Sequence, residues 1–310
     1  IRDRHRNVTY DRAGELVEQL EIDVAGLLEQ AETADTAERD EGQQLPEEIA
    51  RRESLRVKLE QARERLEAQA KAKAASEQAD YVRKVEAREQ RKGSRKGKKI
   101  QPPEDRPDGD GQINLVDADS RLMRKNKRSG YEQCYNAQAT VDADGTQLVL
   151  STRVSQCASD RNELAANVDG VTERVGKPSA VLADSGYACE DQVQKVETEE
   201  VEVYVSTGAE ARHMSRRYDL RPAGRRSESK KDPKTEWLLN MKSKLETDTG
   251  RALYALRKQT VEPVFGIIKE AMGFRQFLLR GLEKVEGEWQ LVALAYNTKR
   301  LWNLKTATSA

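Results

Sequence analysis

The residues best suited to chemistry in this sequence are two carboxylates, and the first of them is Asp184. It directly follows the apolar run 180–183, which predicts a short buried strand. Folds of the α/β class present functional side chains at the carboxyl ends of such strands. Ser185 and Gly186 allow the backbone to turn sharply after Asp184 and a ligand to approach it closely. The same residues would also suit an aspartate in an ordinary turn.

The second carboxylate, Glu262, has the most apolar sequence neighbours of any glutamate in the chain. Burying it among them would be costly unless it were paired with a cation or bound to a metal ion. Tyr254, Lys258 and Lys269 lie at spacings that place them on the same helical face as Glu262. Pro263 predicts that the helix either kinks or begins at this point. An amphipathic helix with an ordinary Lys–Glu pair is the alternative.

Other reaction classes have little support. The two histidines, His5 and His213, are far apart, and the chain has no nucleophile elbow, no P-loop and no dinucleotide-binding glycine motif. The three cysteines lack metal-binding spacing, which argues against a disulfide framework or zinc and favours a reducing cytoplasm. No apolar run is long enough to span a membrane. Carboxylate chemistry with metal ions is the class that remains.

The composition excludes one compact core throughout the chain. Lys+Arg and Asp+Glu each number 54, so the net charge is zero and a uniformly basic nucleic-acid coat is excluded. Charged residues make up 35% of the sequence, against a typical ~25%. Part of the chain must therefore be solvated helix or linker.

The elements that must position the carboxylates fall into three segments. Residues 1–92 predict a long α-helical hairpin arm with a break near Gly42, interpreted as a solvated structural arm or, alternatively, as a contact for DNA or a partner. Residues 93–112 form a Pro/Gly linker, which is either a simple spacer or a phosphate-binding strip. The basic residues of that strip include Arg95, Lys96, Lys98 and Lys99.

Residues 113–310 predict an α/β domain with a mixed sheet and flanking helices. Asp160 and Glu163 have the spacing of a capping box that opens a helix. An irregular basic insert is expected at 207–233, and a helix over 288–302 is expected to pack against the sheet. The predicted strands are 136–141, 147–154, 180–183 and 201–205, the first two joined as a hairpin.

Five blocks of this sequence, in the same order, resemble the DDE transposases of bacterial insertion sequences, in the branch with a helical-arm insertion. The segment 182–187, Leu-Ala-Asp-Ser-Gly-Tyr, resembles the family's L-A-D-x-G-Y motif. The segment 257–269 is similar to the block R-K-x-x-V-E-P-V-F-G-x-I-K. The remaining similar blocks are 119–123, 135–142 and 273–282.

The resemblance implies an RNase H-like fold and strand cleavage and transfer with two Mg²⁺ (or Mn²⁺) ions held by Asp, Asp and Glu. Asp184 would be the second Asp and Glu262 the Glu. Whether Arg257 or Lys258 takes the family's Arg position stays open, because the spacing to Glu262 fits Lys258. The implied DNA-contacting residues are Tyr254, Arg257, Lys258, Lys269, Arg275 and Arg280.

The resemblance also predicts which part of a transposase this is. Residues 5–12 are similar to a family segment that lies downstream of the first Asp, so the chain is expected to begin after that Asp and its strand, as the C-terminal part of the enzyme. The implied partners are insertion-sequence ends, target DNA and a second copy in a homodimer, in the bacterial cytoplasm at the nucleoid. The alternative is a catalytically dead remnant that only binds DNA or dimerises.

Overall fold

The computed structural model describes residues 7–36, 45–90, 100–124, 128–208 and 235–308. The chain divides into two compact units, with the division between Gln133 and Cys134. The boundaries that the sequence predicts at residues 92 and 113 stay a prediction. Residues 91–99, which include the basic side chains of the predicted phosphate-binding strip, lie outside the described residues, as does nearly all of the predicted insert at 207–233.

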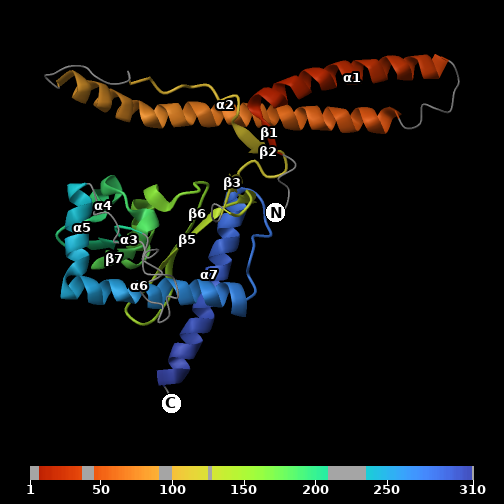
Figure 1. Ribbon diagram of the computed structural model, residues 1–310. Coiled ribbons are helices and arrows are strands. Elements are labelled where there is room, and N and C mark those ends of the chain that lie inside the picture. Colours follow the sequence, from red (N-terminus) through yellow and green to blue (C-terminus); the bar gives the residue numbers. More distant parts are fainter. Residues whose placement is uncertain (1–6, 37–44, 91–99, 125–127, 209–234, 309–310) are drawn as a thin grey trace, which may run out of the picture. The chain divides into compact units, whose positions relative to one another are not determined.

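The first unit is dominated by two long helices that lie side by side, α1 (Tyr10–Thr36) and α2 (Leu45–Gln90) (Figure 1). They run antiparallel, since Arg52 pairs with Asp23 at 2.9 Å and the Tyr10 hydroxyl donates to Glu67 at 2.7 Å. The apolar stripes of the two helices meet in a small core, as the three-to-four spacing predicts. The buried residues of that core include Ala13, Val17, Leu20, Leu59, Ala62 and Leu66.

Two pairs of short strands complete the first unit, and the first pair contacts both long helices. β1 (Asn7–Thr9) pairs antiparallel with β2 (Gln112–Asn114), and β3 (Arg121–Met123) pairs with β4 (Glu132–Cys134). The Asn7 amide oxygen accepts from Asn114 Nδ2 at 3.0 Å and from Gln133 Nε2 at 2.6 Å. These polar groups can be buried because they satisfy one another.

The second unit contains an antiparallel and a parallel strand pair. β5 (Asn136–Val141) and β6 (Val149–Ser155) form the predicted hairpin. Gly145 in the connection has a φ of 100°, a conformation that suits glycine. β7 (Ala180–Ala183) pairs parallel with β8 (Glu202–Val205), and α4 (Glu190–Val196) makes the crossover that a parallel pair needs.

The sheet differs from the prediction. The sequence predicts one mixed sheet, but the described strands pair two by two. The pairs are short, and helices rather than further strands lie against them: α3 (Leu164–Val175) contacts β5 and β6, and α5 (Glu236–Glu246) contacts β8. The unit is therefore a mixed α/β structure in which helix–strand packing supplies much of the burial.

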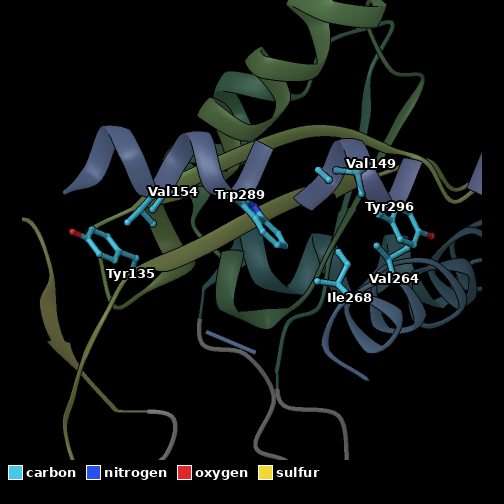
Figure 2. Close-up of a cluster of buried hydrophobic side chains, with 9 residues drawn as sticks. Tyr135, Val149, Val154, Val264, Ile268, Trp289 and Tyr296 are labelled. Carbon is cyan, nitrogen blue, oxygen red and sulfur yellow. The ribbon is translucent and has the colours of Figure 1, made fainter. Parts of the chain in front are cut away.

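One core of the second unit gathers around Trp289 on α7 (Leu282–Thr308), a helix that packs against β6 as the sequence predicts (Figure 2). The Trp289 ring stacks on Phe265 with a centroid distance of 5.8 Å, and its Nε1 donates to the Gln138 carbonyl at 2.8 Å. The other buried members labelled in Figure 2 are Tyr135, Val149, Val154, Val264, Ile268 and Tyr296.

Pro263 does not begin the helix as one alternative predicts, because α6 (Asp248–Gly266) continues through it. The proline lacks the N–H that would bond the carbonyl of Gln259, four residues earlier. The Gln147 side chain replaces that donor, with its Nε2 at 2.7 Å from the Gln259 oxygen. The helix instead begins at Thr247, whose Oγ1 accepts from the Gly250 N–H at 3.0 Å.

Candidate active site

Asp184 stands at the carboxyl end of β7, as the sequence predicts. The preceding residue, Ala183, is buried and pairs with Val205, so the strand end is fixed by the parallel pair. Asp184 has an extended backbone and caps the short 3₁₀ turn Ser185–Tyr187, with its Oδ1 accepting from the Gly186 N–H at 2.7 Å. Its side chain is exposed. The fold therefore presents an oriented carboxylate to solvent.

A second carboxylate, Asp160, lies beside Asp184, and the sequence reasoning missed it. A Cβ built on Gly186 would lie 2.9 Å from Asp184 Oδ1 and 3.2 Å from Asp160 Oδ2. Asp184 Oδ1 and Asp160 Oδ2 both lie within 3.2 Å of this one point, so the two carboxylates are neighbours. The only sequence signal for Asp160 was the capping-box spacing, which pointed to a different role.

The capping-box prediction is wrong in its side-chain contacts. Asp160 Oδ1 accepts from the side-chain amides of Asn136 and Gln138, each at 2.7 Å. Glu163 is buried, and its carboxylate accepts from Arg153 Nη1 and from Ser155 Oγ, each at 2.7 Å. Because both acids find tertiary partners, neither serves the helix N-terminus as predicted.

Tyr187 links these acidic residues electrostatically. Burial raises the pKa of its hydroxyl, and the nearby carboxylates of Asp160, Asp184 and Glu163 raise it further. The group therefore stays protonated and donates a hydrogen bond to Gln138 Oε1. This hydrogen bond ties the partly buried Tyr187, the last residue of the turn that follows Asp184, to β5.

Glu262 lies on α6 and is exposed, as in the amphipathic helix that the sequence leaves as an alternative. Its side chain is 64% exposed, whereas Val264 and Ile268 are buried. The reason is that neighbours in sequence project from different faces of a helix. Arg257 Nη2 lies 3.9 Å from Glu262 Oε1, and the Arg257 guanidinium lies 5.5 Å from the centre of the Tyr254 ring.

The structure brings the two predicted elements together, since α6 packs beside β7. Within the part of the chain that the structure describes, no three histidine, cysteine, aspartate or glutamate side chains converge on a point that could hold a metal ion. The candidate site therefore comprises the exposed carboxylates of Asp184, which follows β7, and Glu262, on the adjacent α6, with the partly buried carboxylate of Asp160 beside Asp184.

The predicted DNA-contacting residues differ in their settings. Lys269 Nζ lies 5.4 Å from the centre of the Phe265 ring, Arg275 pairs with Glu270, and Arg280 is exposed. The Lys258 side chain lies outside the described part of the structure. The same is true of the predicted linker residues Arg95, Lys96, Lys98 and Lys99.

Comparison with known proteins places this site in a family. None of the helices in the described ranges is long and apolar enough to cross a membrane. No curated protein and no solved structure matches the chain. A family model described as "Transposase DDE domain" matches residues 108–298, which is more than half of the sequence and includes both Asp184 and Glu262. The chain therefore belongs to the transposase DDE domain family.

Proposed function

We propose that this chain is the catalytic part of a transposase that cleaves DNA strands and transfers them during movement of an insertion sequence. The observation that carries the proposal is the exposed carboxylate of Asp184, held at a strand end inside the family match. Exposed carboxylates offer the hard oxygen ligands that Mg²⁺ prefers. An RNase H-like arrangement is part of the proposal and rests on the resemblance.

We propose that Asp184 and Glu262 together hold a divalent ion. Mg²⁺ is usually bound through one or two carboxylates, with substrate phosphates and water completing its shell. Two exposed carboxylates on the adjacent elements β7 and α6 fit that pattern. When bound, Mg²⁺ or Mn²⁺ would polarise the phosphoryl group and lower the pKa of an attacking water.

The protein's own residues orient these carboxylates and bind the DNA. The Gly186 N–H holds one oxygen of Asp184, and Arg257 restrains Glu262 from the preceding turn. The basic side chains near Glu262 would contact phosphates, which fixes the substrate's register without reading its sequence. The resemblance further supports a homodimer in the active complex. The proposed phosphate contacts are Tyr254, Arg257, Lys258, Lys269, Arg275 and Arg280.

The test is a strand-nicking assay on supercoiled and linear DNA, with Mg²⁺ or Mn²⁺ and with a chelator. We expect metal-dependent nicking that Asp184→Asn and Glu262→Gln each reduce by several orders of magnitude. The matched controls are the exposed acids Asp191 on α4 and Glu246 on α5, changed to Asn and Gln. Metal-independent DNA binding without nicking would contradict the proposal and support a protein that only binds DNA.

A further inference from the structure

The side chain of Gln138 joins several elements around the Asp184 turn. It lies on β5, is 3% exposed, and uses both of its amide N–H groups and its carbonyl oxygen. Its Nε2 donates to Asp160 Oδ1 at 2.7 Å and to Asn136 Oδ1 at 2.9 Å. Its Oε1 accepts from Asn167 Nδ2 at 3.1 Å and from the Tyr187 hydroxyl. A buried amide satisfied on all sides is held in one orientation.

Asp160 determines the orientation of the Gln138 side-chain amide. An ionised carboxylate accepts hydrogen bonds and donates none, so the NH₂ group of Gln138 must face it. Asn136 also donates to the same oxygen of Asp160, at 2.7 Å. The carbonyl oxygen of Gln138 is consequently directed toward Tyr187, whose hydroxyl is available as a donor.

Tyr187 transmits this restraint to Asp184. Its backbone N–H bonds to the Asp184 carbonyl at 3.2 Å, within the same 3₁₀ turn in which the Gly186 N–H bonds to Asp184 Oδ1. Fixing the Tyr187 ring therefore fixes the turn and the direction of the Asp184 carboxylate. Changing a side chain that orients a metal ligand typically costs about 10–100-fold in metal affinity or activity.

We propose that Gln138 and Tyr187 are positioning residues for Asp184, with the chain of hydrogen bonds from Asp160 through Gln138 to Tyr187 setting the carboxylate's orientation toward a divalent ion. This inference rests on the proposed function, because it assigns Asp184 as a metal ligand. It adds two residues, one of them 46 positions away from Asp184 (184 − 138), that neither touch the substrate nor bind the ion.

The experiment compares Tyr187→Phe with Tyr204→Phe in the full chain. Tyr204 is a fair control because it lies on the neighbouring β8 and donates its hydroxyl to Glu202, outside this chain of hydrogen bonds. We expect Tyr187→Phe to reduce Mg²⁺-dependent nicking roughly 10–100-fold, with DNA affinity unchanged. The loss should be smaller with Mn²⁺, since Mg²⁺ demands near-ideal octahedral geometry. Tyr204→Phe should nick like the wild type.

Two results would overturn the inference: Tyr187→Phe nicking at the wild-type rate, or losing the same fraction of activity with both metals. If the wild type does not nick DNA at all, the proposed function fails on its own. The positioning is then tested by hydrogen exchange at the Gly186 N–H. Faster exchange in Tyr187→Phe but not in Tyr204→Phe supports it, and equal exchange in all three proteins contradicts it.

Discussion

Two acidic side chains of the candidate site, Asp184 and Asp160, both lie against Gly186. Even a methyl group there would meet Asp184 Oδ1 at 2.9 Å and Asp160 Oδ2 at 3.2 Å, closer than ordinary van der Waals contact. The absence of a side chain thus lets both carboxylates share the space over the turn. Glycine is needed at this position because a side chain would displace the two charged groups. Its backbone does not adopt a conformation that only glycine favours.

Gly186→Ala should displace one or both carboxylates while leaving the protein folded. We expect Mn²⁺ affinity, measured by calorimetry, to fall roughly 10–100-fold. The free energy of unfolding should change by less than about 1 kcal/mol, since the turn is exposed. Gly287→Ala in α7 is the control, because nothing lies within 4 Å of its added methyl group. Unchanged Mn²⁺ affinity in Gly186→Ala would show that the turn does not orient a metal ligand.

The sequence could reveal some of these residues and not others. Asp184 was predictable because a short apolar run followed by Asp-Ser-Gly is a local signal for a strand end. Asp160 was not, since its neighbours Asn136 and Gln138 are brought to it by tertiary structure alone. The sequence singles out Glu262 as a candidate but leaves its exposure open, because linear neighbours say little about which helix face carries a side chain.

The element that departs furthest from local rules is α6, a helix with proline in its interior. Loss of the N–H at Pro263 leaves the Gln259 carbonyl without its helical donor, and an unpaired backbone group of this kind is costly. Gln147 removes most of that cost by donating from the β5–β6 hairpin at 2.7 Å. The hairpin and the helix that carries Glu262 are therefore coupled through one side chain.

A double-mutant cycle tests this coupling. Gln147→Ala alone should lower the free energy of unfolding by roughly 1–2 kcal/mol, because it leaves the Gln259 carbonyl unsatisfied. In a Pro263→Ala background the alanine supplies the missing N–H. Gln147→Ala should then lower the free energy of unfolding by only a few tenths of that amount. Urea unfolding followed by tryptophan fluorescence measures both. Equal costs in the two backgrounds would mean that the Gln147 contact does not compensate for the proline.

Secondary structure was predictable where local signals agree, and its assembly was not. The hairpin over β5 and β6 follows from alternating apolar residues around Asp-Ala-Asp-Gly, and the arm follows from helical apolar spacing. The pairing of strands two by two depends on which helices cover them, and no local pattern encodes that choice. The bond from Gln147 to Gln259 spans 112 positions and is equally invisible in the sequence.

At the scale of the whole molecule, burial is divided among separate cores. Leu59, 1% exposed, belongs to the core between α1 and α2 in the first unit, whereas Trp289 belongs to a core of the second unit. All three tryptophans, at positions 237, 289 and 302, lie in the second unit. Tryptophan fluorescence therefore reports on the second unit, and far-ultraviolet circular dichroism reports on the helices of both.

Leu59→Ala should destabilise the first unit selectively. Removing a buried leucine side chain typically costs about 2–5 kcal/mol, so the part of the circular dichroism transition due to the arm should move to lower urea concentration. The fluorescence transition should stay where it is. Leu55→Ala, in the same helix but 41% exposed, should leave both transitions in place, since it should change the free energy of unfolding by no more than about 0.5 kcal/mol. A matching shift of both transitions in Leu59→Ala would show that the two units unfold as one.

The proposed function depends above all on Asp184 and Glu262 holding one divalent ion between them, and Mn²⁺ affinity in a double-mutant cycle measures whether they do. Calorimetric titration of the wild type, Asp184→Asn, Glu262→Gln and the double variant gives the four affinities required. If the two carboxylates share an ion, each single change should weaken binding and the double variant should lose much less than the sum, with a coupling of roughly 0.5–3 kcal/mol. Losses that add to within about 0.3–0.5 kcal/mol would show that the two residues act at independent places and would contradict the shared site.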